Sequence, residues 1–216
     1  SAILELGGFD IPVELKREQY LEAVEQICNM LAMDPYPGFE GKYFSMPCRN
    51  IVPKPAQRPH PPLWVACSNR ETIKMAARLG IGALTFAFVD PLEAKHWVDE
   101  YYSIIKSDEC VPIGHTVNAN IAMVTSFSLH QDREEAISRG LEGFEFFGYA
   151  LGALYGFGEH KPGRTNLFKQ FREAREKQLA EMPVDITESL TGARGGIGTP
   201  DDMRGPLKKF EEVGVD

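Results

Sequence analysis

Hydrophobic and polar residues follow two alternating patterns along this chain. Short apolar runs of strand length are each followed by a segment in which apolar residues recur every three or four positions, as in an amphipathic helix. The apolar runs predict strands at 63–66, 83–88 and 119–127. Three consecutive strand–helix units with apolar strands indicate a parallel sheet covered by helices.

The clearest of these units extends from Pro61 to Gly80. Its apolar run at 63–66 has the length of a central parallel strand, and Ser68 and Glu71 have the spacing of a capping box, which predicts where the next helix begins. The start of such a helix presents unpaired N–H groups and the positive end of the helix dipole to a phosphate. A plain helix cap explains the same residues, so both interpretations stay open.

Caps and apolar stripes indicate further helices. One is expected at 13–31, and others are expected after the caps at Asp90, Asp132 and Thr199. The residues expected to point inward from the first and last of these helices are Tyr20, Leu21, Val24, Ile27, Cys28 and Leu31, and Met203, Leu207, Phe210 and Val213.

Other segments are expected to be irregular. Residues 1–12 are expected to form a loop, and Pro206 should kink or shorten the last helix. A Gly-rich, charged insertion extends over 148–198, and an insertion of that size is more often functional than structural. Aromatic residues and glycines over 144–158 fit either core packing or a pocket for an apolar or flat substrate.

Composition narrows the classes of function. The 216 residues carry a net charge of −8 and no basic stripe, which argues against nucleic acid as the main partner. No apolar run approaches the roughly 18 residues of a membrane span. The four cysteines are far apart without a C-x-x-C spacing, so a disulfide framework or a zinc site is not expected, and a reduced, cytoplasmic setting fits best.

Few residues show a spacing typical of catalysis. The five histidines share no metal-binding spacing, so no metal is expected, and His115 and His160 are the better candidates because they lie in loops. Arg17 lies in the first turn of the first helix, at the N-terminal end of its apolar stripe, where it suits a phosphate contact or a salt bridge. The strand–helix order fits a doubly wound sheet or a barrel, and the lack of a G-x-G-x-x-G motif disfavours a Rossmann fold.

Five segments together carry a family resemblance: GFDIPVELKREQYLEAVEQI, GKYF, NIVPKPAQRPHPPLWVACSN, AARLGIGAL and IGTPDDMRGPLKKFEEVGVD. They resemble the bacterial luciferase-like flavin-dependent monooxygenases, in the same order and over nearly the whole chain. The resemblance implies a (β/α)8 TIM barrel, present here as a fragment that lacks the first strands and the last strand. The chain is then a single domain over 1–216, from about strand 5 to the helix before strand 8, with the insertion near 148–198, and a piece of a longer protein.

The resemblance also implies a function. Reduced FMN, supplied by a separate NAD(P)H-flavin reductase, would react with O2 to oxygenate a small organic substrate, and the full-length protein would be a homodimer. A deazaflavin-dependent oxidoreductase of the same fold and a non-catalytic flavin-binding protein are the alternatives.

The resemblance places the cofactor by position. Arg17 and Ser68 match residues that contact the flavin phosphate, and Thr72 falls near a threonine that assists them. Cys67 lies where the backbone passes the flavin ring, and Glu5 resembles an acidic residue of a preceding loop. The active-site histidine of the family belongs to the first strands, so the catalytic residues are unknown from this chain.

Overall fold

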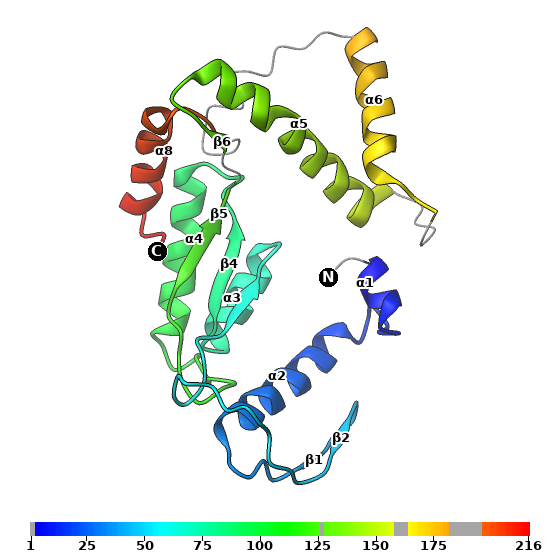
Figure 1. Cartoon of the computed structure of the whole chain (residues 1–216). Helices are drawn as coiled ribbons and strands as arrows, with labels where there is room; N and C mark the ends of the chain where they lie inside the picture. The colour runs from blue at the N-terminus through cyan, green and yellow to red at the C-terminus, as the bar shows by residue number, and fades with distance from the viewer. Residues whose placement is uncertain (1–2, 126–127, 158–163, 182–195) are drawn as a thin grey trace. The chain divides into compact units, whose positions relative to one another are not determined.

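A computed structural model describes residues 3–125, 128–157, 164–181 and 196–216 (Figure 1). The chain forms two compact units, one of Ser1–Val13 with Thr125–Lys209 and one of Glu14–Val124 with Phe210–Asp216. Within the described ranges, none of the helices combines the length and apolar character that a bilayer crossing requires. The sequence-based assignment of a single domain over 1–216 stays a prediction.

The second unit is built on a parallel sheet of β3 (Trp64–Ala66), β4 (Gly82–Phe86) and β5 (Ile121–Val124), in the order β3-β4-β5. The predicted parallel sheet is therefore confirmed. The expectation that 63–66 forms a central strand is wrong for this sheet, because β4 lies in the middle and β3 at one edge. An apolar run of four residues does not distinguish these two positions.

Helices α3 (Arg70–Arg78) and α4 (Pro91–Ile105) pack against one face of this sheet and against each other. The predicted cap of α4 is confirmed: Asp90 accepts a hydrogen bond of 3.0 Å from the amide of Glu93, and Pro91 occupies the first turn. The buried core between helices and sheet consists of Cys67, Ile73, Ala76, Ala77, Ala83, Val98, Tyr101, Ile104, Ile105 and Ile121.

The other face of the sheet is apolar and largely exposed. Trp64, Leu84 and Val124 are 45%, 37% and 44% exposed, and Phe86 is similarly open. In the strand register Phe86 lies opposite Val124, and both side chains point away from the face that α3 and α4 cover. We call the residues Trp64, Ala66, Leu84, Phe86, Ala122 and Val124 the bare face.

Helix α2 (Lys16–Ala32) confirms the helix expected at 13–31, and a small hairpin, β1 (Phe39–Glu40) with β2 (Ser45–Met46), follows it. Cys28 is buried as expected, whereas Ile27 is about half exposed. The expectation for Ile27 is wrong because the buried stripe turns toward Gln26 instead, whose side chain accepts a hydrogen bond from the buried Tyr36 hydroxyl.

The first unit is mostly helical. Its strands β6 (Ser128–Leu129) and β7 (Ile197–Gly198) form a short parallel pair, against which α5 (Arg133–Gly152) packs. Helix α5 continues into a π-helical turn, η1 (Ala153–Phe157), so the start of the expected irregular insertion is helical.

A second helix, α6 (Leu167–Glu181), lies within the same insertion and packs on α5. Phe146 of α5 contacts Phe168 and Phe171 of α6, with ring centroids 5.1 and 5.5 Å apart. Phe146 therefore packs between the two helices, whereas Tyr155 of the same aromatic run is 56% exposed, and a pocket lined by the rest of the run stays a prediction. The residues 158–163 and 182–195 of the expected insertion lie outside the described residues.

Two further expectations concern the ends. Residues 1–12 were expected to form a loop, but α1 (Ile3–Gly8) is helical and buries Leu6. Helix α8 (Pro200–Glu212) begins at the predicted cap, where Thr199 and Asp202 exchange hydrogen bonds. It continues beyond Pro206, so this proline does not shorten it, and a kink there stays a prediction. Leu207 is half exposed, contrary to its expected inward position.

Candidate functional site

The turn between β3 and α3 brings three of the predicted site residues together: Cys67, Ser68 and Thr72. The residue that caps α3 is Asn69, which is extended and accepts a 3.0 Å hydrogen bond from the Thr72 amide. The predicted capping box of Ser68 with Glu71 is therefore wrong, and α3 begins one residue later. Asn69 directly follows Ser68, and asparagine caps a helix as well as serine does, so spacing alone favoured the wrong residue.

Because Asn69 provides the cap, the Ser68 side chain is available to contact a ligand. Its side chain is exposed, and its hydroxyl accepts a long hydrogen bond of 3.4 Å from the Asn69 carboxamide. In the described part of the chain, the amides of Arg70 and Glu71 in the first turn of α3 have no hydrogen-bond acceptor. An exposed hydroxyl beside open N–H groups at the positive end of a helix dipole suits an anion.

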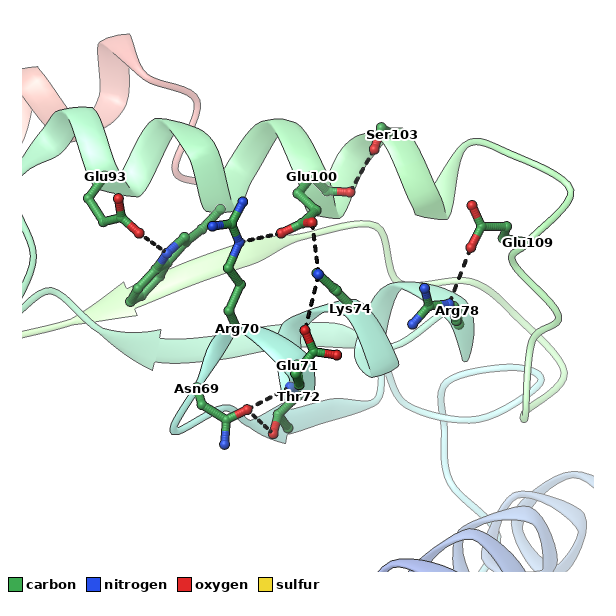
Figure 2. Close-up of polar contacts among 11 residues, drawn as sticks. Asn69, Arg70, Glu71, Thr72, Lys74, Arg78, Glu93, Glu100, Ser103 and Glu109 are labelled. Carbon is green, nitrogen blue, oxygen red and sulfur yellow. Dashed lines mark hydrogen bonds and ion pairs between the residues drawn. The ribbon is translucent and has the colours of Figure 1, made fainter.

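Thr72 supports the cap in this arrangement. Its hydroxyl donates a 3.1 Å hydrogen bond to the same Asn69 oxygen that its amide contacts (Figure 2). The Thr72 proton is therefore committed to Asn69, and only the oxygen of this hydroxyl is left to accept a further hydrogen bond.

Cys67 lies on the covered side of the sheet. Its thiol contacts the carbonyl of Val65 at 3.4 Å, and its amide donates to Leu84 at 2.7 Å. Burial raises the pKa of the thiol to about 11, although a backbone hydrogen bond with Leu84 opposes this. The thiol is thus neutral at pH 7 and is not a nucleophile. A ligand beyond the end of β3 would meet the backbone of Cys67 and not its side chain.

Arg17 lies in the first turn of α2, where it is exposed and forms no ion pair among the described residues. Tyr20 follows three positions later, on the same side of the helix. Burial raises the pKa of Tyr20, and the nearby Cys67 and Cys28 thiols add to this increase. The contact of Arg17 with a phosphate at the start of α3 stays a prediction.

Arg70 is a residue near the site that the sequence analysis missed. Its Nε lies 2.6 Å from the Glu100 carboxylate of α4, and Lys74 joins Glu100 to Glu71 at 3.1 Å on each side (Figure 2). This network directs the Arg70 guanidinium toward α4 and fixes the first turn of α3 against that helix. The sequence around Arg70 carries no signal for a partner such as Glu100, which lies 30 positions away.

The histidines take other positions. His60 is buried and hydrogen-bonded, His115 is exposed and contacts the Asn29 carboxamide, and His160 lies outside the described residues. Among the described residues, no three histidine, cysteine or acidic side chains form a metal-binding group. Glu5 is an exposed residue of α1, in the other unit from Ser68.

Comparison with known proteins decides the family. Residues 4–216 match the family model described as luciferase-like monooxygenase. The chain belongs to this family. It is also 32% identical, over 187 residues, to the uncharacterized protein y4wF of Sinorhizobium fredii (strain NBRC 101917 / NGR234). That match covers 83% of this chain and 50% of y4wF.

Two solved structures of this luciferase-like fold are similar to the chain. The monooxygenase RslO1 from Streptomyces bottropensis has a TM-score of 0.63 at 18% identity, with 99% of this chain and 56% of RslO1 covered. An F420-dependent secondary alcohol dehydrogenase has a TM-score of 0.59 at 15% identity, with coverage of 94% and 55%. At these identities the likeness shows the fold, and it confirms the luciferase-like barrel type. The chain spans about half the length of these proteins.

Proposed function

We propose that this chain is the cofactor-phosphate-binding part of a flavin-dependent monooxygenase. The observation that carries the proposal is the start of α3, where the exposed Ser68 hydroxyl lies beside the open amides of Arg70 and Glu71. These groups follow the carboxyl end of a parallel strand, where barrel enzymes bind phosphates. Arg17 would add a guanidinium from α2, which suits bidentate contact with phosphate oxygens.

The proposed cofactor is FMN, which is reduced by a separate NAD(P)H-flavin reductase. Reduced FMN, when bound, supplies the electrons for the reaction of O2 with a small organic substrate. The residues of this chain would bind and orient it: Ser68, Arg17 and the α3 amides hold the phosphate, and the backbone at Cys67 passes the ring. Thr72 would contribute by keeping the Asn69 cap in place. No catalytic residue is proposed from this chain.

We further propose that the chain is part of a (β/α)8 barrel. The chain would lack the first strands and the last strand of that barrel. The bare face supports this, because an apolar sheet face of a barrel points toward the packed interior. The half-length coverage of the similar proteins agrees with it. A homodimer of the full-length protein is a proposal that rests on the family resemblance.

A deazaflavin-dependent oxidoreductase is the second candidate, because one similar structure is an F420-dependent dehydrogenase. To separate these candidates, the full-length protein is titrated with FMN and, separately, with the deazaflavin, and oxygen consumption is measured after the bound cofactor is reduced. Oxygen use with FMN supports the monooxygenase, and deazaflavin binding without oxygen use supports the alternative. FMN binding without any turnover would indicate a non-catalytic flavin-binding protein.

The phosphate assignment makes a mutational prediction. Arg17→Ala and Ser68→Ala should each weaken FMN binding by about 1–3 kcal/mol, because each removes a hydrogen bond to a charged group. Flavin fluorescence titration measures this change. Arg78→Ala and Ser103→Ala are matched controls in the same unit, since Arg78 pairs with Glu109 and Ser103 bonds a carbonyl of α4 (Figure 2). Equal affinity in all four variants would refute the assignment.

A further inference from the structure

A hollow lies at the end of the sheet opposite Ser68. It has a volume of about 320 Å³ and is bounded by residues that precede β3 and β5, among them Arg58, His60, Thr116 and Asn118. The amino-terminal ends of parallel strands carry stability rather than catalysis in barrel proteins. We therefore expect this hollow to bind a ligand and not to catalyse a reaction.

The walls of the hollow are held in place by buried hydrogen bonds. The His60 ring is almost fully buried, its Nδ1 lies 2.8 Å from the Pro61 carbonyl, and its Nε2 accepts the His115 amide at 3.0 Å. The Nε2 atom therefore acts as the acceptor of this pair, and Nδ1 faces the Pro61 carbonyl. On the other wall, the Asn118 carboxamide donates to the Leu63 carbonyl at 2.9 Å. The two segments are tied together before any ligand arrives, which lowers the entropic cost of binding.

The hollow has a positive lining in an acidic chain. Arg58 is its charged residue, and no carboxylate contributes to its wall. In the described ranges the Arg58 guanidinium has neither an ion pair nor a hydrogen bond, whereas Arg70, Arg78 and Arg139 are each paired with a glutamate. Gln57 and Thr116 also line the hollow, and their side chains carry uncharged donors.

We propose that this hollow binds the oxyanion group of a small molecule, a phosphate or a carboxylate. The Arg58 guanidinium supplies the charge and a planar pair of donors, and Gln57 and Thr116 complete the contacts. The site is separate from the proposed cofactor phosphate site, since the length of the sheet lies between them.

Amide NMR spectra of the chain during titration with inorganic phosphate and, separately, with acetate test this proposal. We expect saturable shifts of the Thr116 and Val117 amides with at least one of the two anions, and the stronger one identifies the group recognised. Sodium chloride at matched ionic strength should not produce them. Shifts of the Arg70 and Glu71 amides report the cofactor site instead, so the two proposals fail independently.

Arg58→Gln should weaken the anion affinity measured at Thr116 by about tenfold or more, because a charge-assisted contact is lost, whereas Arg58→Lys keeps part of it. Arg49→Gln is the matched control: this exposed arginine pairs with Tyr36 through its backbone, so its side chain can be changed without loss of the pair. The absence of saturable shifts at Thr116, or an unchanged affinity in Arg58→Gln, would overturn the proposal. The amide spectrum of each variant also reports its folding.

Discussion

Ser68 and Asn69 divide two tasks at the start of α3. Asn69 accepts hydrogen bonds from the amide and the hydroxyl of Thr72, which fixes the first turn of the helix. Ser68 is exposed and takes little part in that cap. Because the tasks lie on different side chains, mutations can separate the stability of α3 from binding at its N-terminus.

Asn69→Ala should lower the free energy of unfolding by about 1 kcal/mol, the usual cost of losing an N-cap. Ser68→Ala should change it by less than about 0.5 kcal/mol, as expected for an exposed side chain outside a cap. Urea denaturation of both variants measures the difference. A larger loss in Ser68→Ala than in Asn69→Ala would restore Ser68 as the cap.

Tyr101 is a fully buried residue of α4 whose hydroxyl contacts three backbone groups near the sheet. Its hydroxyl lies 2.9 Å from the Ile81 carbonyl and 3.1 Å from the Asn118 carbonyl, and accepts the Asn120 amide at 3.2 Å. Burial raises the pKa of this hydroxyl far above its ordinary value, so it stays protonated. It thereby links α4 to the segments before β4 and β5.

Tyr101→Phe should therefore lower the free energy of unfolding by about 1–3 kcal/mol, because it leaves buried backbone groups without a partner. Tyr102→Phe is the control, since that ring is only partly buried and its hydroxyl contacts the Asp216 carboxylate. Chemical denaturation compares them. An equal effect in the two variants would contradict the central role of Tyr101.

At the scale of elements, the hairpin β1–β2 is attached to α2 by two carboxylates: Glu18 contacts the Lys42 and Tyr43 side chains, and Glu22 contacts the backbone. Glu22 accepts hydrogen bonds from the amides of Lys42 and Tyr43, both at 2.9 Å, and of Phe44 at 3.2 Å. Partial burial raises the pKa of Glu22, but the three amides outweigh it and hold this pKa below its ordinary value of about 4.5. Three donors on one carboxylate stabilise its charged form.

This attachment should depend on pH. A group whose pKa is lower in the folded state stabilises that state above its unfolded pKa, and the contribution is lost as pH falls through the folded pKa. The amide chemical shifts of Tyr43 and Phe44 should therefore stay constant around pH 7 and change as the pH falls below about 4.5. Glu22→Gln should abolish this transition at the Phe44 amide, whereas the Tyr43 amide also responds to Glu18, which contacts the Tyr43 hydroxyl. Glu25→Gln, an exposed neighbour, should not abolish it. A transition of the Phe44 amide that persists in Glu22→Gln would show that another group titrates.

The sequence predicts those elements that depend on interactions between residues close together along the chain. The strand–helix units and the caps at Asp90, Asp132 and Thr199 are confirmed, since period and cap residues are local signals. The edge position of β3 and the Glu22 contacts were not predictable, because both depend on partners about twenty positions away.

The sequence likewise predicted the place of the candidate site but not the role of each residue in it. Its place after β3 follows from the strand–helix pattern, and Cys67, Ser68 and Thr72 do lie there. The choice between Ser68 and Asn69 as cap required the backbone geometry, and the role of Arg70 required the position of α4. The affinity of Arg17 for a phosphate stays a prediction.

At the scale of the whole molecule, the two faces of the three-stranded sheet should respond differently to mutation. Ile121 is fully buried under the helices, whereas Leu84 of the bare face is 37% exposed. Ile121→Ala should cost about 2–5 kcal/mol of unfolding free energy, the range for core truncations, and Leu84→Ala less than about 1 kcal/mol. Denaturation of the chain measures both. Comparable losses would mean that the bare face is already covered in solution.

The most direct test of the central claim compares FMN with riboflavin, which lacks the phosphate. The amide NMR signals of Arg70 and Glu71, at the open start of α3, report contact with that group. We predict that FMN shifts these signals, that riboflavin leaves them in place, and that Ser68→Ala reduces the effect of FMN. Equal shifts with both compounds, or no shift with FMN, would contradict phosphate binding at this turn.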